Sequence, residues 1–586
     1  MVLRNRAAAL FVISGVALFF GGAVSCGSAW AQTPPSPPTF VPTPNVVVPP
    51  PALTPRDINV TPASALPDRP APPRELNKPE DDIRIDVKAF AVSDDAPAEL
   101  RAALAGLTAR YTGPGRGFED LVNAAAEVTR FMQRDLGLYL GFAYLPEQDP
   151  SAGVVRIAIL EGRLDKVVLN WTSGLPVDQD VVDAYLTRLV PGSVLRVRDV
   201  ERVVFLVNDL RGITATFEVR AGSTPGTATL VVTPRAEGIW SGKVEADANG
   251  SRFLGIYELG GLVQMNSPFG RGDGLTANAL VSTTGGLAFA LLGYTTPVGS
   301  DGIKLGASVS GVKYQLDRDE FPLDLNGTAL TINGYGLYPV VRARNLNLFA
   351  LGSAENKTYV DRQEAAGGET EKTVDSIAFG ATGDFRDSLL GGAVSTFDGS
   401  VVAGRVNYPK GRPAGLDDAE SFAKLVFGYT RLQDILTGRL LGYVSLRAQH
   451  ALQNLDTTEQ FRLGGPGGVR AFAPGEGTGD SGAVMNFELR LLPPEEWFGR
   501  ISREFVMSAF VDVGLVRYRK EPRITSNPTP QANTDVFSGA GIGLSWARPN
   551  EYALRFSLAV PTSGEPRSDT KERSPRLYLL FTKYFL

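Results

Sequence analysis

The chain has 586 residues and a net charge of −5 at pH 7, with 43% hydrophobic and 21% charged residues. This length exceeds one ordinary globular core, so we expect two to four structural units. The small acidic excess provides no basic surface for nucleic acid. The single cysteine, Cys26, cannot form an intramolecular disulfide or a cysteine-rich metal site.

Residues 1–31 are predicted to be a secretory signal peptide. Arg4 and Arg6 precede an apolar stretch over residues 7–24, and small residues form an A-x-A cleavage site that ends at Ala31. An uncleaved anchor is the alternative interpretation. Beyond this segment no apolar run is long enough for a transmembrane helix, but a membrane β-barrel would leave no such run.

Residues 32–80 are rich in proline and include the stretch PTFVPTPNVVVPPPALTP. Such a segment buries too little apolar surface to fold alone, and it tends towards polyproline II. We interpret it as an extended periplasmic linker.

Residues 81–164 and 165–236 show the same predicted order of elements, β-α-α-β-β. In the first module the breaker TGPGRG (residues 112–117) separates the two helical segments. The two modules therefore form an internal repeat by pattern, although not by identity. The predicted elements are strands 83–92, 142–148 and 154–164 with helices 96–111 and 118–136, and then strands 165–171, 214–222 and 228–236 with helices 178–190 and 197–210.

Residues 237–586 consist of strand-length segments separated by turns rich in Gly, Asn, Asp and Pro. Within residues 505–515, Val511 falls on the apolar face of a strand, whereas Phe510 and Asp512 fall on the other face. A soluble sandwich and a membrane barrel give the same alternation, because the sandwich buries its apolar face and the barrel turns that face to lipid.

Three features favour the barrel: the signal peptide, segments of ten or more residues, and the aromatic C-terminal stretch LYLLFTKYFL. About sixteen such segments can be counted, an even number as in bacterial barrels. The predicted fold is therefore two periplasmic modules followed by a transmembrane antiparallel β-barrel of about 16 strands.

Several stretches are recognisable in combination: YLP-Q and LEGR in the first module, VERVVFLVNDLRGITATFEVRAG in the second, EADANGSRFLGIYELGGLVQMNSPFGRGD, FRLGGPGGVRAFAPGEGTGDSG, and FVDVG. Together they resemble the outer-membrane transporters of two-partner secretion, the TpsB family (ShlB/FhaC/HecB-like) of the Omp85 superfamily, over residues 81–586. The resemblance implies two POTRA domains (81–164 and 165–236), a barrel (237–586) and a loop (454–482) folded back into its lumen. The sequence shows no convincing plug helix in residues 32–80.

The resemblance also assigns residues to sites. The loop motif comprises Gly464, Gly465, Gly467, Gly468, Val469 and Phe472. The strand motif that receives the loop comprises Phe510 and Gly514, and the C-terminal insertion signal comprises Tyr584, Phe585 and Leu586. The chain departs from the family pattern twice, with Ala471 in place of a loop glycine and Leu586 after the usual final phenylalanine.

Arg470 stands between apolar residues in this glycine-rich loop. A phosphate-binding loop would need a Lys-Ser/Thr pair and a following helix, and neither is present. An ordinary surface hairpin loop is the plainer alternative. Because an arginine inside a narrow lumen is costly unless it is paired, we predict that Arg470 pairs with Asp512 as a latch, and that the glycines let the backbone pass through a crowded interior.

The function implied by the resemblance is translocation of a partner exoprotein across the outer membrane of a Gram-negative bacterium. The POTRA domains, in the periplasm, would bind an unfolded client that carries an N-terminal secretion domain, by adding a strand to an open sheet edge. The apolar helix at 200–210 is interpreted as packing on its own sheet, with a partner groove as the alternative. Other expected partners are outer-membrane lipid and, for insertion of the chain itself, the barrel-assembly machinery and periplasmic chaperones. No cofactor is expected.

Three alternative functions remain: a barrel-assembly factor of the Omp85 type, a passive porin, and a barrel enzyme. An assembly factor usually has more than two POTRA repeats, and a porin has no use for periplasmic modules. An enzyme would have to rely on His450, the only histidine, and its predicted place near the outer rim favours a plain polar residue. The acidic stretch DRDE (317–320) is expected to be solvated rather than to bind calcium, so no catalytic or metal site is predicted.

Overall fold

The computed structural model describes residues 84–436, 438–522, 532–569 and 574–585. The predicted signal peptide (1–31) and the proline-rich linker (32–80) lie outside the described residues. None of the helices in the described ranges is long and apolar enough to cross a membrane.

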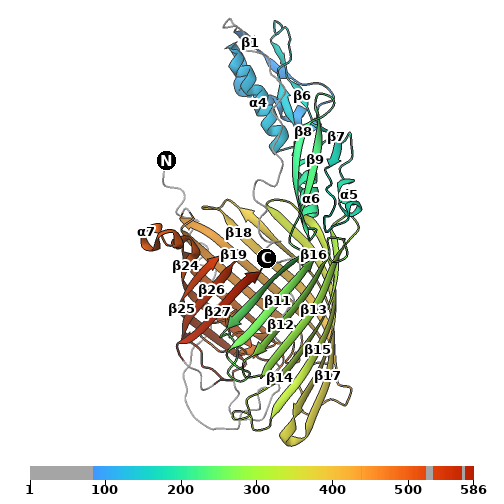
Figure 1. The fold of residues 1–586 in the computed structure, drawn as a ribbon. Coiled ribbons are helices and arrows are strands. Elements are labelled where there is room, and N and C mark those ends of the chain that lie inside the picture. Colours follow the sequence, from blue (N-terminus) through green and yellow to red (C-terminus); the bar gives the residue numbers. More distant parts are fainter. Residues whose placement is uncertain (1–83, 437, 523–531, 570–573, 586) are drawn as a thin grey trace. The chain divides into compact units, whose positions relative to one another are not determined.

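The first module packs two helices, α3 and α4, against pairs of short strands (Figure 1). Leu100 of α3 and Val128 and Met132 of α4 are fully buried in its core. The predicted helix breaker, residues 112–117, also forms strand β3, which pairs with β1. Within it Gly113 has a φ of 116°, a conformation that glycine tolerates. The elements are β1 (Ile85–Val87), β2 (Ala89–Ala91), α3 (Ala98–Thr108), η4 (Ala109–Tyr111), β3 (Gly113–Arg116), α4 (Phe118–Arg134), β4 (Phe142–Tyr144), β5 (Val154–Arg156) and β6 (Ala158–Leu160).

The second module is a three-stranded sheet in the order β7-β9-β8, with two helices between β7 and β8 in the chain. Val203, Val204 and Val207 of α6 are buried in a cluster that includes Phe217 of β8. Most of the apolar face of α6 therefore packs on its own module. The elements are β7 (Arg163–Leu169), α5 (Gln179–Leu186), α6 (Val197–Asn208), β8 (Ile213–Ala221) and β9 (Thr227–Ala236), which confirms the predicted β-α-α-β-β order.

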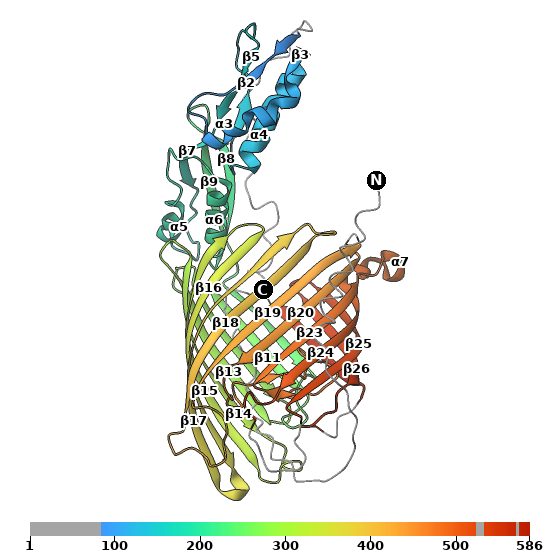
Figure 2. The ribbon, with the colours of Figure 1, turned by 180° about the vertical axis from the view of Figure 1, so that it is seen from behind.

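The remaining chain forms a closed antiparallel barrel of sixteen strands (Figure 2). The barrel closes because β10 pairs with its neighbour β11 and also with the last strand, β27. The strands are β10 (Trp240–Asp247), β11 (Glu258–Asn266), β12 (Gly274–Ser282), β13 (Leu287–Val298), β14 (Ile303–Gln315), β15 (Leu325–Arg342), β16 (Leu346–Gln363), β17 (Gly368–Asp387), β18 (Ala393–Asn407), β19 (Ser421–Leu436), β20 (Leu440–Ala451), β23 (Ser481–Leu491), β24 (Phe505–Arg517), β25 (Thr534–Arg548), β26 (Tyr552–Ser563) and β27 (Arg576–Phe585).

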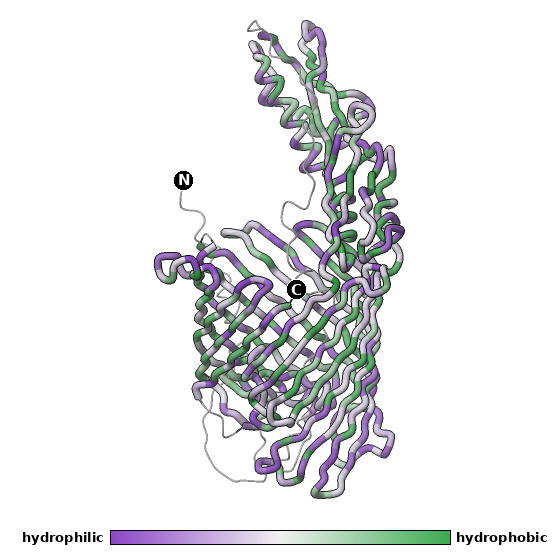
Figure 3. Tube along the Cα trace, in the orientation of Figure 1, coloured by the Kyte–Doolittle hydropathy of each residue, from purple (hydrophilic) through white to green (hydrophobic). Residues whose placement is uncertain are grey.

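The two faces of the barrel wall differ in polarity, as the alternation predicts. On β24, Val511 is 47% exposed on the outside, whereas Phe510 and Asp512 are buried on the inside. Hydropathy alternates in the same way along the other strands (Figure 3). An apolar outer face and a polar lumen are what a barrel in lipid requires.

The strands differ in length around the barrel. β10 has 8 residues, whereas β15 has 18 and β17 has 20. Because roughly 9–11 residues suffice to cross a bilayer, the long strands extend beyond the membrane at the end opposite the two N-terminal modules (Figures 1 and 2).

Candidate functional site

The candidate site is the segment between β20 and β23, which enters the barrel from the extracellular side. Its two legs pair as the short strands β21 (Phe461–Arg462) and β22 (Thr478–Gly479). At the tip the backbone folds into a compact turn held by its own hydrogen bonds. The N–H of Val469 donates to the carbonyl of Leu463 at 2.8 Å, and the N–H of Gly468 donates to the carbonyl of Gly465 at 2.9 Å. The tip is therefore an ordered plug and not an open surface loop.

The four glycines of the loop motif have different roles. A Cβ on Gly468 would lie 1.8 Å from the carbonyl oxygen of Leu463, and one on Gly464 would lie 2.1 Å from that of Ala473. Gly465 has a φ of 114°, in the left-handed region that favours glycine. Gly467 is exposed, and a Cβ there would meet nothing within 4 Å. Close packing or backbone conformation thus requires three of the four.

The structure brings Arg470 and Asp512 together. The Arg470 guanidinium donates to both carboxylate oxygens of Asp512, at 2.9 Å and 2.7 Å, and the backbone N–H of Arg470 donates to the same carboxylate at 3.0 Å. The Asp512 side chain is 0% exposed and that of Arg470 is 12% exposed. A bidentate pair of this kind is short, directional and strongly charge-assisted.

Two further residues of β23 complete this cluster and were not predicted as site residues. Glu488 accepts a hydrogen bond from Arg470 at 2.6 Å. Asn486 donates to Asp512 and to the carbonyl of Gly468, both at 2.8 Å. The signal was available, because alternation along β23 places Asn486 and Glu488 on the luminal face, and β23 is the direct neighbour of β24.

Apolar contacts seat the tip against the barrel wall. The Arg470 guanidinium carbon lies 3.4 Å from the centre of the Phe510 ring, a cation–π contact. Phe472 meets Phe537 of β25 edge to face, with 4.8 Å between ring centres. The side chain of Val469 lies over Gly514: a Cβ added to Gly514 would lie 2.8 Å from Cγ2 of Val469.

Ala471, the departure from the family pattern, is accommodated by the barrel wall. It does not have a positive φ, and its side chain is 3% exposed. A Cβ on Gly539 of β25 would lie 2.4 Å from the Cβ of Ala471. The extra methyl group of the loop therefore occupies the space that a glycine leaves on the strand beneath it.

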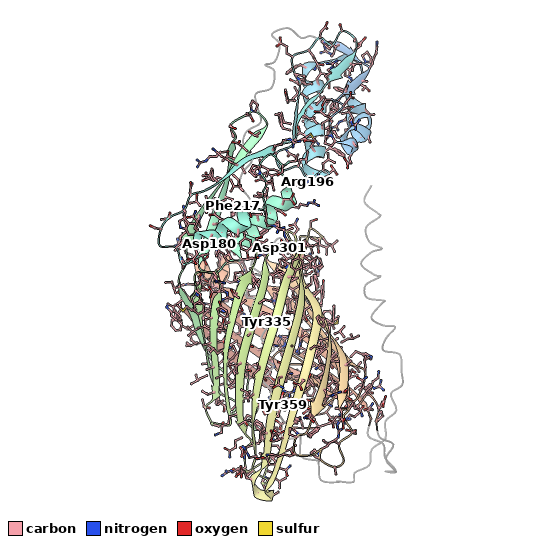
Figure 4. All side chains as sticks on the ribbon, turned by 90° about the vertical axis from the view of Figure 1, so that its right-hand side faces the viewer. Asp180, Arg196, Phe217, Asp301, Tyr335 and Tyr359 are labelled. Carbon is pink, nitrogen blue, oxygen red and sulfur yellow. The ribbon has the colours of Figure 1, made fainter. Side chains whose placement is uncertain are left out.

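A second ionic cluster holds the first leg of the loop to strands β16, β17 and β19. Glu459 pairs with Lys357 of β16 at 3.0 Å and with Lys424 of β19 at 2.9 Å, and Asp456 pairs with Lys372 of β17 at 2.8 Å. The two carboxylates are 4% and 5% exposed. Tyr359, beside Lys372, lies towards the end of the long strands that is farthest from the second module (Figure 4). No sequence motif predicts this cluster.

The other leg of the loop is fastened to neighbouring extracellular loops. The buried carboxylate of Glu476 accepts hydrogen bonds from the backbone N–H groups of Arg567, Ser568 and Asp569. Asp480 accepts from the backbone N–H of Lys520 at 2.8 Å. Movement of the whole loop would thus disturb the β24–β25 and β26–β27 loops, whereas movement of the tip alone would not.

The remaining predicted residues lie elsewhere. Tyr584 and Phe585 end β27 and pair with Lys243 and Gly242 of β10 at the closure of the barrel. Leu586 lies outside the described residues. His450 is exposed on β20.

Of the stretch at 317–320, Arg318 pairs with Asp324 and Glu320 pairs with Arg252. Among the residues that the structure describes, no group of three or more His, Cys, Asp or Glu side chains could hold a metal ion.

The second module contacts periplasmic turns of the barrel. Asp209, after α6, accepts hydrogen bonds from the Arg342 guanidinium at 3.0 Å and 2.5 Å. Burial opposes ionisation of Asp209, but Arg342 and Lys304 lower its pKa below the ordinary value. Arg202 of α6 donates to the carbonyl of Asp301, which lies in the β13–β14 turn facing the second module (Figure 4).

The closed barrel with an apolar outer face, the two modules before it and the loop inside it define the architecture of an outer-membrane β-barrel protein. A family model described as haemolysin secretion/activation protein ShlB/FhaC/HecB matches residues 226–546. A second model, the ShlB-type POTRA domain, matches residues 91–162. The chain therefore belongs to the ShlB/FhaC/HecB family.

Known proteins agree with this assignment. The heme/hemopexin transporter protein HuxB of Haemophilus influenzae is 25% identical over 461 residues, which cover 78% of this chain and 80% of HuxB. Among solved structures, CdiB from Escherichia coli has a TM-score of 0.66 at 19% identity, covering 88% of this chain and 93% of CdiB. BamA from Haemophilus ducreyi lacking POTRA domains 1–3 has a TM-score of 0.51 at 14% identity, covering 86% of this chain and 100% of that one.

These matches establish what the chain does in broad terms. It is an outer-membrane protein with POTRA modules in the periplasm, and it translocates a partner exoprotein in two-partner secretion. Its family consists of transporters and not of enzymes.

Proposed function

We propose that the two modules, assigned as POTRA 1 (81–164) and POTRA 2 (165–236), receive an unfolded exoprotein and that the barrel (237–586) conducts it outwards once the loop (454–482) yields. The observation that carries this proposal is the contact of Arg470 with Asp512 and Glu488 inside the lumen. The contact is strong but not covalent, so the loop can act as a latch that a client releases.

The edge of β8 is the proposed docking site for the client. The Asn208 side chain donates to the carbonyl of Ala215 and accepts from its N–H, so it covers the edge at that residue. Because alternate residues of a strand present their backbone groups to the same side, Phe217 (Figure 4) and Val219 direct theirs to the same open edge. A client segment can pair there as an added strand.

The client is proposed to be an exoprotein with an N-terminal secretion domain. Folding of the client outside the cell is proposed to bias the direction of its movement. Insertion of the transporter itself is proposed to depend on the barrel-assembly machinery and periplasmic chaperones, with outer-membrane lipid around the barrel.

The decisive experiment compares proteins secreted by cells with and without this chain. Loss of one large exoprotein is the expected result. A general loss of outer-membrane barrels would instead indicate a barrel-assembly factor, the alternative function. Deletion of residues 81–236 should abolish client binding and leave a heat-modifiable barrel, and a client still retained by that barrel would refute the receptor role of the modules.

A point change tests the docking edge within the full chain. Val219→Pro removes one outward N–H from an edge strand, where proline is tolerated. We expect weaker binding of the client's secretion domain, measured by pull-down with the purified transporter. Val219→Ala keeps the N–H and should bind normally, and equal binding by both variants would place the client elsewhere.

A further inference from the structure

The periplasmic turn between β23 and β24 is unusually long and carries its own helices. It spans residues 492–504, whereas the next periplasmic turn, between β25 and β26, spans only residues 549–551. Within it, α7 (Glu495–Phe498) leads into the 3-10 helix η6 (Gly499–Glu504). Both ribbon views show α7 projecting sideways from the barrel wall (Figures 1 and 2).

This turn exposes three large apolar side chains to solvent. Trp497 is 57% exposed, Phe498 is 48% exposed and Ile501 is 47% exposed. Three such side chains within five positions form an apolar patch that is unfavourable in water, and patches of this kind mark interaction surfaces.

Polar contacts hold the turn in this conformation. The buried hydroxyl of Ser502 donates to the carbonyl of Pro494 at 2.9 Å. Arg503 pairs with Glu495 at 2.6 Å, and Arg548 of β25 pairs with Glu504 at 2.8 Å. The exposed apolar side chains are thus presented by an ordered scaffold and are not the product of a loose turn.

Aromatic rings connect this patch to the lipid-facing wall. The ring centres of Phe498 and Phe505 are 5.6 Å apart, and those of Phe505 and Trp546 are 5.7 Å apart. Trp546 is 36% exposed on the outer face of β25, and its indole N–H donates to Glu504 at 2.9 Å. The patch therefore continues the surface that the barrel presents to lipid, with polar groups at its water side.

We propose that residues 494–504 form a membrane foot, which inserts Trp497, Phe498 and Ile501 among the phospholipid headgroups of the periplasmic leaflet. Tryptophan is favoured at the membrane–water interface, and an amphipathic segment lies there with its apolar face buried about 5–10 Å. Continuity with the lipid-facing wall selects lipid over a client polypeptide as the occupant.

The foot lies on a different part of the rim from the second module. That module contacts the β11–β12 turn at Gly270, the β13–β14 turn at Asp301 and the end of β15 at Arg342. The foot follows β23, so it can hold a separate sector of the rim in the membrane while the modules handle a client.

Spin labels in the full chain test the foot. Phe498→Cys and Glu496→Cys place a label on opposite sides of α7, and the only natural cysteine, Cys26, lies in the predicted signal peptide. Each protein is reconstituted into phosphatidylethanolamine/phosphatidylglycerol vesicles, and collisions with O2 are compared with those with a water-soluble nickel chelate. We expect a higher ratio of O2 to nickel accessibility at position 498. Equal, water-like ratios at both positions would overturn the proposal.

Two further readouts separate lipid from client. Brominated lipids should quench the fluorescence of the wild type more than that of Trp497→Phe. The control variant Trp171→Phe, changed in the second module, should be quenched as strongly as the wild type. If position 498 loses access to the nickel chelate only when the client's secretion domain is added, the patch is a client site and the foot is refuted. Heat modifiability of each variant confirms that the barrel has formed.

Discussion

The tip and the first leg of the luminal loop are both held by ion pairs, but the two clusters are built differently. At the tip one cation, Arg470, links Asp512 to Glu488, and Glu488 also pairs with Arg490. At the leg, Lys357 and Lys424 pair with Glu459, and Lys372 pairs with Asp456. Loss of Arg470 leaves the buried Asp512 without its cation, whereas loss of one lysine at the leg leaves the other two ion pairs in place. The tip therefore has the properties of a release point and the leg those of an anchor.

The largest effect is expected from Arg470→Ala. It leaves Asp512 buried without its cation, and breaking a buried pair in this way costs roughly 3–5 kcal/mol. We expect higher conductance of the purified protein in planar bilayers and reduced secretion of the client. Arg470→Lys keeps the charge without the bidentate fork and should give an intermediate result.

Reversing both charges of the tip provides a control. Arg470→Asp combined with Asp512→Arg should recover part of the function if the two side chains act by touching each other. Wild-type conductance in Arg470→Ala would mean that this contact is not a latch.

Gly468→Ala and Gly467→Ala form a matched pair that tests how the tip is packed. The added methyl group at position 468 would lie 1.8 Å from a backbone oxygen, whereas the one at position 467 meets nothing within 4 Å. Overpacking of this kind costs roughly 1–3 kcal/mol. Trypsin added outside cells should cut the displaced tip at Arg470 in the first variant only; equal resistance of the two variants would contradict the packing.

Gly539→Ala tests the seat of Ala471 and should have a somewhat smaller effect. The two methyl groups would clash, because a Cβ on Gly539 lies 2.4 Å from the Cβ of Ala471. Adding Ala471→Gly, which restores the family's usual residue, should remove the clash and bring conductance back towards the wild-type value. If the double variant is no better than Gly539→Ala, the two positions are not coupled.

The sequence predicts the two modules, the barrel and the faces of its strands well, because alternation and helical periodicity are local signals. The luminal face of Asp512 follows from such alternation. The partners of Asp456 and Glu459 could not be predicted, because Lys357, Lys372 and Lys424 come from three strands whose register is set only when the barrel closes. The membrane foot was missed for another reason: EEWFGRISREF is too short to show a periodic pattern.

Glu459→Gln should have the smallest effect of these changes at neutral pH. Lys357 retains Glu355 at 2.8 Å, and Lys424 retains its hydrogen bond to the backbone carbonyl of residue 459 at 2.7 Å. The loop should stay resistant to external trypsin, with only a modest rise in conductance. A loss of resistance as large as that of Arg470→Ala would make the leg, and not the tip, the main point of attachment.

The pH dependence of the leg has a definite sign. Burial opposes ionisation of Glu459, which lies in the loop outside the strands, yet Lys424 and Lys357 lower its pKa from 4.5 to about 2. A carboxyl whose pKa is lowered on folding contributes stability above its unfolded pKa, and the contribution is lost as pH falls from 4.5 towards 2. Between pH 7 and pH 5 the wild-type leg should therefore remain attached, as measured by protease resistance. Release within that interval, abolished by Glu459→Gln, would show that the pKa of Glu459 lies above its ordinary value and that the lysines do not hold its carboxylate.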